Sequence, residues 1–439
     1  MPYQRRQVLG FTLAAPFALA LKPALAANRA DVSRQVLLTW HKLILELVRH
    51  TATYMPPVAA RAFGYIGVTA HEALATGNPA LRSLAGQLTD LAALPARDAG
   101  AYDEPCVLHA ALNAAVTGLF ANTGPSGQQA MGKMSEIMGR TASEGIASDI
   151  VDRSVAHGQA VAAHILDWAA ADGGAVIDNM GFPRDYTPGT RPQDWVPTSA
   201  IRLQQAPLLP GWGGNRPFAV KDMAAMDAPA HPDYDEAPDS AFFGFAKEVA
   251  ETGKALTDEQ KLIARFWSDD AMLTSTPAGH WISIVMQIAD RDALPAETIA
   301  STLAKLGVAQ ADAFISCWST KFKYNLLRPV TYIKRHIDKA WEPLLITPPF
   351  PEYTSGHSCQ SGAASTVLTA IFGDGFGFDD ATNVNEGLPV RSFPSFAAAA
   401  EEAAISRMYG GIHFRFGNEA GLAQGRAIGA IAAQLRTEA

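Results

Sequence analysis

Three separated segments in the C-terminal half of the chain carry the residues whose types and spacing could do chemistry. The first runs from Lys321 to Arg328 and ends at Pro329. The two cations are seven positions apart, so they share one face of a helix, and Trp318 joins that face one turn earlier. Such a pair either binds an anion or forms an ordinary solvated basic stripe, and this segment alone leaves both readings open.

The second segment is Ser355-Gly356-His357, which follows the proline-rich stretch Pro349-Phe350-Pro351. We expect a helix to begin here, and the free N–H groups of a helix start bind anions. Gly356 lets a ligand approach the backbone closely, and His357 would stand beside that ligand as an acid or a base. The alternative is an ordinary helix cap with a surface histidine.

The third segment runs from Ser406 to His413 and contains Arg407. Arg407 and His413 are six positions apart, which would splay them by about 120° on a continuous helix. The Gly410-Gly411 pair breaks the helix and can bring them back together. The alternative is a helix C-terminus with favourably placed cations.

Taken together, the three segments supply a cage for a tetrahedral, multiply charged oxyanion. Arginine offers paired donors that match the oxygens of such an anion, and lysine adds a point charge. One histidine can bond the central atom while the other transfers protons on the opposite side. The donors of this predicted cage are Lys321, Arg328, Ser355, Gly356, His357, Arg407 and His413.

Composition indicates that helices must position these residues. Apolar residues make up 48% of the 439 residues, so a sizeable core can be buried. Alanine is abundant, and it loses no side-chain entropy in a helix. We therefore predict a helical protein.

Charge and cysteine content exclude several classes of protein. The formal net charge of −8 argues against a large nucleic-acid surface. Three cysteines, Cys106, Cys317 and Cys359, do not make a disulfide framework, and no CxxC or CxxCH motif indicates zinc or covalent haem. Four histidines in the first half lack a metal-binding pattern and are expected to bond within the core: His71, His109, His157 and His164.

The chain divides into four regions by pattern. Residues 1–26 resemble a twin-arginine signal peptide, with Arg5-Arg6 before a short apolar stretch and Ala24-Leu25-Ala26 as the cleavage pattern. This predicts a periplasmic or secreted protein, with no transmembrane span in the mature chain. Residues 27–172 are expected to be helical, and 173–240 to form an irregular, loop-rich junction. Residues 241–439 form the second helical region, which carries the site.

The helices of the second region can be placed from their end signals. Thr257 to Gln260 is a capping box. Pro295 suits a first helical position, and the helix after it should end by Arg328 because Pro329 disfavours helical geometry there. Further helices are expected at Ser355 to Phe372, at 395–409 and at Asn418 to Leu435.

The pattern Lys-x6-Arg-Pro, Ser-Gly-His, Ser-Arg-x5-His resembles the three-part signature of the vanadium-dependent haloperoxidases and the related type 2 phosphatidic acid phosphatases. The flanking residues resemble the haloperoxidase branch more closely. These flanks are Trp318, the prolines around Phe350, Phe266-Trp267-Ser268-Asp269-Asp270, and Pro277-Ala278-Gly279-His280-Trp281. The resemblance implies an all-α fold of helical bundles, in two halves that each resemble a four-helix bundle. It also implies an enzyme that holds vanadate and oxidises halide with hydrogen peroxide to hypohalous acid, without haem or flavin.

The resemblance also implies a role for each residue. His413 would be the vanadium ligand and His357 the acid–base residue. The cations would neutralise the oxyanion, with Lys321 also polarising peroxide, while Ser355 and the Gly356 amide would hydrogen-bond it. Asp270, or as the second choice Asp269, would orient a cationic residue of the site. The halide side would be lined by Trp318 and Phe350.

One position departs from the family pattern. The family often has Asp four residues after the vanadium-ligating histidine, and here that residue is Gly417. A histidine ligand needs a neighbouring acceptor to fix its tautomer. A backbone carbonyl, Asn418 or Glu419 is expected to serve.

Two other functions compete with the haloperoxidase. A phosphatase on the same scaffold would use His413 as the nucleophile of a phosphohistidine and His357 as the proton donor to the leaving group. A non-catalytic protein would bind vanadate or phosphate without turnover. The halide, a small organic acceptor, and the oligomeric state are not determined by the sequence.

Overall fold

The computed structural model describes residues 29–439. The predicted signal segment 1–26 lies outside the described residues. Thirteen α-helices and one two-stranded sheet make up the described chain, and this confirms the all-α prediction. None of the helices within residues 29–439 is both long and apolar enough to cross a membrane.

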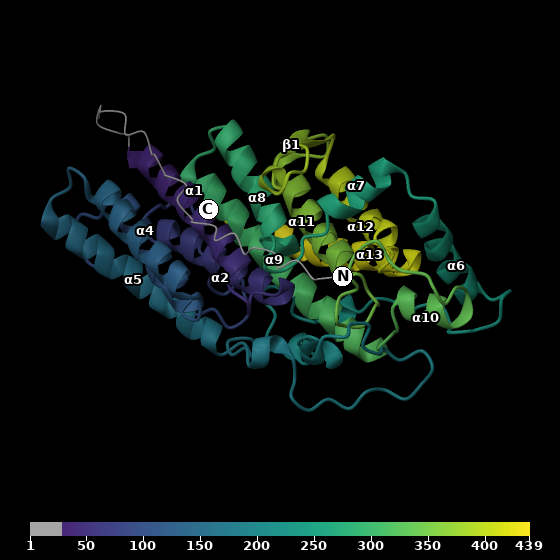
Figure 1. Cartoon of the computed structure of the whole chain (residues 1–439). Helices are drawn as coiled ribbons and strands as arrows, with labels where there is room; N and C mark the ends of the chain where they lie inside the picture. The colour runs from purple at the N-terminus through teal and green to yellow at the C-terminus, as the bar shows by residue number, and fades with distance from the viewer. Residues whose placement is uncertain (1–28) are drawn as a thin grey trace, which may run out of the picture.

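The first half of the molecule is a bundle of five helices, coloured purple to blue in Figure 1. Proline stands in the first turn of α2, α3 and α4, where its missing N–H costs nothing. Asp103 caps α3 by accepting a hydrogen bond from the Cys106 amide at 3.1 Å. The five helices are α1 (Arg29–His50), α2 (Pro56–Ala75), α3 (Glu104–Leu119), α4 (Pro125–Ser143) and α5 (Ser148–Ala170).

The longest helix, α9 (Ala296–Tyr324), joins the two halves. It packs against α2 on one side and against α11 (Gly356–Phe372) and α13 (Arg415–Ala433) on the other (Figure 1). Contact with α2 requires glycine, because a Cβ on Gly67 would lie 2.5 Å from the Leu303 carbonyl oxygen. Helix α9, which runs through the middle of the molecule, therefore carries Lys321 and packs against the helix that begins after Ser355.

The second half contains the remaining helices and the small sheet. The Thr257 capping box is present, and α11 and α12 begin within one residue of their predicted starts. Antiparallel pairing joins β1 to β2, which the sequence did not predict. The elements not yet named are α6 (Ala241–Lys254), α7 (Asp258–Phe266), α8 (Thr276–Arg291), α10 (Pro329–His336), α12 (Phe396–Tyr409), β1 (Phe378–Asp380) and β2 (Arg391–Phe393).

Helix α9 ends earlier than predicted. Asn325 adopts left-handed geometry with φ 52° and stops the helix four residues after Lys321. Arg328 then becomes the residue that precedes a separate short helix, α10, instead of the last residue of α9. Pro295 likewise precedes α9 instead of opening it.

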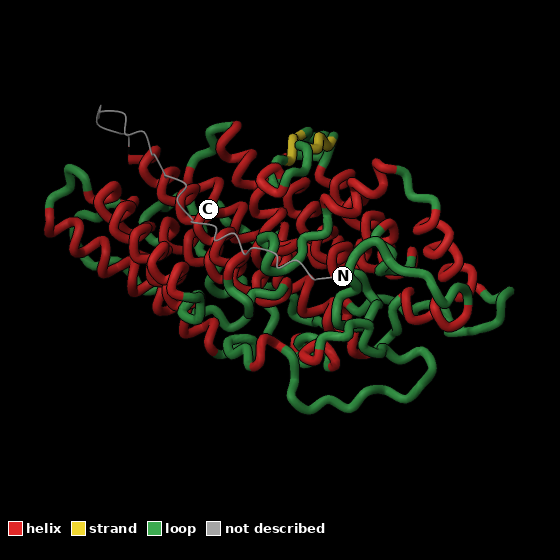
Figure 2. The backbone as a smooth tube through the Cα atoms, in the orientation of Figure 1, coloured by secondary structure: helices red, strands yellow, loops and turns green. Residues whose placement is uncertain are grey.

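The loop-rich segment 173–240 is ordered by backbone contacts, and Figure 2 shows it as a long green tube with short helical turns. Its turns are η1 (Asn179–Gly181), η2 (Arg202–Gln205), η3 (Trp212–Gly214) and η4 (Ala224–Met226). The buried carboxylate of Asp312 on α9 accepts hydrogen bonds from the amides of residues 218, 219 and 220 at 2.6–3.0 Å. The Leu208 amide donates to the Pro349 carbonyl at 2.9 Å, so the loop reaches the proline-rich approach to the site.

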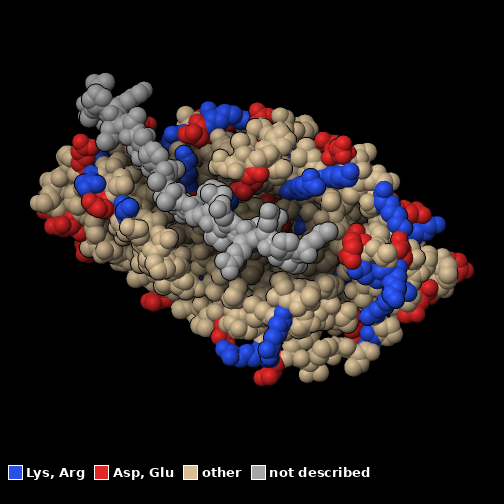
Figure 3. Space-filling model, viewed as in Figure 1, with Lys and Arg blue, Asp and Glu red and all other residues tan. Residues whose placement is uncertain are grey.

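Surface charge follows the composition. On the face seen in Figure 3, acidic and basic side chains are interspersed, and many of them gather toward the end of the molecule formed by α6 and α10.

Candidate functional site

The fold brings the three predicted segments together inside the second half. Lys321 lies at the end of α9, Ser355 caps α11, and Arg407 lies in the last turn of α12. Lys321, Arg328 and Ser355 are fully buried, while Arg407 and His413 are each 3% exposed. Burying three cations is costly unless anionic partners compensate them.

Arg328 connects two of the segments. Its Nε donates to the Phe350 carbonyl at 2.8 Å, and its Nη1 donates to the Ile412 carbonyl at 2.9 Å. The same Nη1 lies 3.0 Å from Nε2 of His413. Its other terminal nitrogen, Nη2, is buried and has no hydrogen-bond partner in the structure.

His413 is held in one tautomer. Its Nε2 faces the Arg328 guanidinium, which can only donate, so Nε2 carries the lone pair. Its Nδ1 then carries the proton, which it donates to Oε1 of Glu352 at 2.7 Å. Burial and the neighbouring cations hold the pKa of His413 well below its ordinary value, which keeps the ring neutral. A neutral ring with a free Nε2 is the form that can bond a metal.

Glu352 is the functional residue that the sequence reasoning missed. We expected the partner of His413 to be a backbone carbonyl, Asn418 or Glu419. Instead, Asn418 accepts from the Ser358 hydroxyl at 3.4 Å, and Glu419 is exposed. The one available signal was a lone acid, Glu352, in the otherwise uncharged stretch between Pro348 and Ser355.

Glu352 also explains the departure at Gly417. A Cβ at position 417 would lie 2.3 Å from Oε1 of Glu352, so a larger residue there would displace the Glu352 carboxylate. The carboxylate beside His413 therefore comes from the loop before α11, and it occupies the space that a side chain at position 417 would enter. Glu352 also accepts from the Phe414 amide at 3.1 Å, which fixes its orientation.

Lys321 binds the loop that precedes α11, which also carries Glu352. Its ammonium donates to the carbonyls of Pro351 and Glu352 at 2.9 Å each, and to that of Thr354. An ammonium group has three hydrogens, and all three are used. Lys321 therefore shapes the loop, and it adds charge to the site without a free donor in this structure.

Arg407 and His357 each have a buried nitrogen without a hydrogen-bond partner. Arg407 donates from Nη1 to the Trp267 carbonyl, while its buried Nε has no partner. Nε2 of His357 is buried and unpartnered, and the ring bonds the backbone of Ser268. Since Nδ1 makes that bond, Nε2 is the unprotonated nitrogen, ready to accept a proton.

Both predicted aspartates lie close enough to Arg407 for their charges to raise its pKa. Asp270, the first choice, is exposed, and its own pKa is raised by partial burial, which outweighs the lowering by Arg407. Asp269 is buried, and its Oδ1 bonds Nδ1 of His280 at 2.8 Å. Its Oδ2 lies 3.7 Å from Nε2 of His357. Asp269, the second choice, is thus the buried carboxylate that reaches His357, and its backbone is left-handed, with φ 48°.

Trp318 and Phe350 form an aromatic wall beside the cations. Their ring centroids are 4.9 Å apart, and the guanidinium carbon of Arg328 lies 4.9 Å from the Phe350 centroid. A Cβ on Gly356 would lie 3.6 Å from the Trp318 ring, which places the start of α11 against this wall. The Trp318 indole donates to the Leu208 carbonyl at 3.2 Å, so the irregular loop closes this side.

The electrostatics fit an anion. Burial lowers the pKa of Lys321 to about 8, of Arg328 to about 9 and of Arg407 to about 10. Burial also raises the pKa of Glu352 to about 7. A buried oxyanion would compensate the three cations and raise their pKa values back toward the ordinary ones.

The unused atoms fit the same group. Buried donors without partners include Nη2 of Arg328 and Nε of Arg407, and no described residue accepts the amide hydrogens of Gly356 and His357 at the start of α11. Across the described chain, no group of three or more His, Cys, Asp and Glu side chains is placed to hold a bare metal ion. The donor set therefore suits a vanadate-like oxyanion bonded by one histidine.

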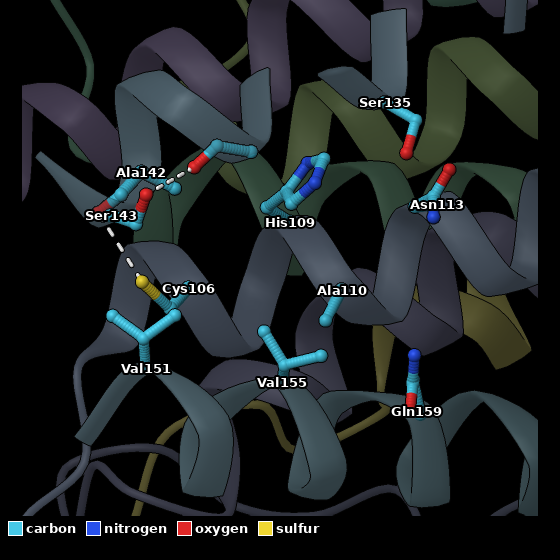
Figure 4. A pocket seen from close by; sticks show the side chains of 11 residues that line it. Cys106, His109, Ala110, Asn113, Ser135, Ala142, Ser143, Val151, Val155 and Gln159 are labelled. Carbon is cyan, nitrogen blue, oxygen red and sulfur yellow. Dashed lines mark hydrogen bonds between the residues drawn. The ribbon is translucent and has the colours of Figure 1, made fainter. Parts of the chain in front are cut away.

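A separate cavity in the first half lacks these features. It has a volume of about 290 Å³ and opens between α3, α4 and α5, where Figure 4 shows Cys106, His109 and Asn113 along its wall. None of its lining residues is a cation. It is therefore not a candidate oxyanion site.

Comparisons with known proteins agree with the geometry. A family model described as the VCPO second helical-bundle domain matches residues 301–439. The solved structure of a bacterial vanadium-dependent iodoperoxidase is 36% identical, with a TM-score of 0.84, and the match covers 92% of this chain and 97% of that chain.

More distant structures share the fold. The holo form of a bacterial vanadium-dependent chloroperoxidase is 16% identical, with a TM-score of 0.66 and coverage of 94% of both chains. Its apo form matches with the same identity and TM-score. At this identity the likeness is one of fold alone. No curated protein sequence matches the chain.

Proposed function

This chain belongs to the vanadium-dependent haloperoxidases, and we propose that it holds vanadate on Nε2 of His413 and oxidises iodide more readily than the other halides. The overall reaction is X⁻ + H₂O₂ + H⁺ → HOX + H₂O. The bound vanadate would act as a Lewis acid that activates peroxide without changing its oxidation state. The rest of the chemistry falls to the residues of the chain.

One observation carries the proposal. The lone pair of His413 faces a buried site in which Arg328 and Arg407 keep unpartnered N–H groups. Leaving such donors unpaired in a protein interior costs about 1–3 kcal/mol each. Oxygens of a tetrahedral anion would accept from them, and Arg328 would release its contact with Nε2 of His413.

Glu352 has the role of holding the ligand histidine. It accepts the Nδ1 proton of His413, which keeps the lone pair on Nε2 and raises the basicity of the ring. Lys321 keeps the loop that carries Glu352 in place through the carbonyls of residues 351, 352 and 354. The site is thus preorganised before the anion arrives.

His357 has the role of moving the proton. Its free Nε2 takes a proton from hydrogen peroxide and returns it when the halide has been oxidised and water leaves. The reaction consumes one proton for each hypohalous acid formed, so a residue that accepts and returns protons is required. Nε2 of His357 is buried and has no partner in the described chain, so it is free to take up that proton.

The choice of iodide is supported by the similarity to a bacterial vanadium-dependent iodoperoxidase, which is 36% identical to this chain. Iodide is also the most polarisable halide and the easiest to oxidise, so it demands the least activation of peroxide. The aromatic wall of Trp318 and Phe350 suits a large, weakly hydrated anion. A small organic acceptor would be halogenated by the released hypohalous acid.

The test is a metal-reconstitution assay with three arms. The purified protein is freed of bound oxyanion, titrated with orthovanadate, and assayed with peroxide and iodide, bromide or chloride. We expect oxidation that requires vanadate and is fastest with iodide. Hydrolysis of a phosphomonoester by the vanadate-free protein, without halide oxidation, would indicate the phosphatase instead. Tight binding of vanadate with neither activity would indicate a binding protein.

We also propose that the protein is exported in the folded state. The support is the sequence pattern of Arg5-Arg6, a short apolar stretch and Ala24-Leu25-Ala26. Replacing both arginines by lysine should retain the protein in the cytoplasm of an expressing bacterium, as measured by fractionation. Export that is unaffected by the replacement would contradict the proposal.

A further inference from the structure

A second buried histidine lies behind the site and uses both of its ring nitrogens. His280 on α8 is 1% exposed. Its Nδ1 lies 2.8 Å from Oδ1 of Asp269, and its Nε2 lies 2.8 Å from Oδ2 of Asp380. A carboxylate only accepts, so each nitrogen must donate, and the ring is a doubly protonated imidazolium.

The surroundings hold this ring and its partners rigidly. The Trp267 ring stacks on His280 at 4.5 Å between centroids and 18° between planes. The amide of Thr382 donates to Oδ1 of Asp380 at 2.9 Å, so the end of β1 fixes the outer carboxylate. The small sheet therefore anchors a charged side chain inside an otherwise helical protein.

The chain of contacts leads into the site. The inner carboxylate, Asp269, uses Oδ1 for His280, while its Oδ2 is buried and without a hydrogen bond. That free oxygen lies 3.7 Å from Nε2 of His357, which is also buried and without a partner. Two complementary groups that both lack partners face each other across a short gap.

We propose that His280 and Asp380 are positioning residues for the reaction, which hold the Asp269 carboxylate so that its Oδ2 stabilises His357 while Nε2 carries the transferred proton. This inference rests on the proposed role of His357. In the step, an O–H bond of peroxide breaks and an N–H bond forms at Nε2, with no change of oxidation state. The protonated ring then has an acceptor on each side, the Ser268 carbonyl and Asp269.

Charges from every neighbouring element act on His357. Besides burial, the cations Arg407 of α12, His280 of α8 and Lys321 of α9 lower its pKa. Asp269 supplies the closest negative charge, from the loop between α7 and α8. Changing the charge of His280 or Asp380 should therefore move the pH at which His357 takes up its proton.

Two variants should shift that pH in opposite directions. His280→Gln removes a positive charge and should therefore raise the pKa of His357. The part of the pH profile of kcat/KM for iodide that reports this titration should move to higher pH by about one unit. Asp380→Asn removes a negative charge while its amide oxygen still accepts from His280. Asp380→Asn should therefore lower the pKa of His357 and move the same part of the pH profile to lower pH, by a smaller amount.

Matched controls separate positioning from stability. His71→Gln removes another fully buried histidine, on α2, whose Nε2 bonds the Arg82 carbonyl at 2.8 Å. Asp379→Asn removes the exposed neighbour of Asp380 on the other face of β1. Both should leave that part of the pH profile in place, and His71→Gln should lower the melting temperature.

The measurements are the pH profile with vanadate and the ¹⁵N histidine resonances of the vanadate-free protein, assigned with His357→Gln. Opposite shifts of the His357 titration support the inference. A lowered melting temperature with unmoved profiles in both His280→Gln and Asp380→Asn would overturn it. If the wild type oxidises no halide, the proposed function fails, and the resonances alone decide the inference.

Discussion

The two halves of the molecule bury histidines in different ways. In the first half, His41 bonds the Leu37 carbonyl at 2.9 Å, His71 bonds the Arg82 carbonyl, and His109 accepts from the Trp40 indole at 3.2 Å. Each partner is neutral. In the second half, His280 and His413 bond carboxylates, and His357 faces a third group of the same kind.

Both halves of the described chain contain buried atoms without partners, Nε of Arg34 and of Arg97 among those of the first half. Only in the second half do several of them belong to charged or titratable groups that act on one histidine, since Arg328, Arg407 and His357 all lower the pKa of His413. Native interiors rarely leave such groups unsatisfied. Histidines with neutral partners thus serve packing, whereas charged ones surrounded by unpaired donors mark a place where a ligand completes the structure.

The largest expected difference is in the rate of halide oxidation, between the variants His413→Ala and His109→Ala. Removing His413 takes away the only group proposed to bond vanadate, so halide oxidation should fall to the rate seen without vanadate. Removing His109 should cost about 1–3 kcal/mol of stability through the unpaired Trp40 indole and leave activity per folded molecule unchanged. Reconstitution assays and denaturant unfolding check the pair, and a vanadate-dependent His413→Ala enzyme would contradict the assignment.

The next effect concerns the relocated carboxylate. Glu352→Ala should weaken orthovanadate binding about 10–100-fold, because His413 loses the partner that fixes its tautomer. Gly417→Asp alone should also impair binding, since its Cβ would meet Glu352 at 2.3 Å.

The double variant is the decisive measurement. Glu352→Ala with Gly417→Asp returns a carboxylate to the position that the family often uses and removes the clash. Vanadate affinity, measured by calorimetry and by activity titration, should then recover above that of either single variant. Additive losses would show that Glu352 acts only by filling space.

These residues also mark the limit of what the sequence could predict. The three motifs, the helical class and the helix starts at Thr257 and Ser355 depend on local spacing, which a sequence displays directly. The Glu352 partnership joins residues 61 positions apart through a loop without periodicity, and the Asp269–His280–Asp380 contacts join segments up to 100 positions apart. Helical periodicity does not predict such contacts, because they join residues that are far apart in the sequence. Helix α9 ends at Tyr324 because Asn325 adopts a left-handed backbone conformation. The pattern of apolar residues does not predict this conformation.

A smaller effect is expected at the aromatic wall. Trp318→Phe keeps a ring against Phe350 but removes the indole N–H that donates to the Leu208 carbonyl at 3.2 Å. Loss of one hydrogen bond of about 1 kcal/mol should raise the KM for iodide about fivefold with less change in kcat. Steady-state kinetics check this, with Trp168→Phe in the first half as the control, since its indole also bonds a loop carbonyl. Equal kinetic effects of both would remove Trp318 from the halide side.

The last expected difference is the pH dependence of stability, and its sign differs between the halves. Burial lowers the pKa of His109 to about 4, so the unfolded chain takes up a proton first as the pH falls. The contribution of neutral His109 is present above about pH 6.5 and is lost as the pH falls toward 4. For His280, Asp269 and Asp380 outweigh burial and raise the pKa to about 10, so its contribution is complete below about pH 6.5 and is lost as the pH rises toward 10. Urea unfolding of His109→Gln and His280→Gln against the wild type should therefore give differences that grow toward high pH for the first and toward low pH for the second. Parallel slopes would mean that the buried charge of His280 is not maintained, and the distinction between the two halves would then lie in their unpaired donors alone.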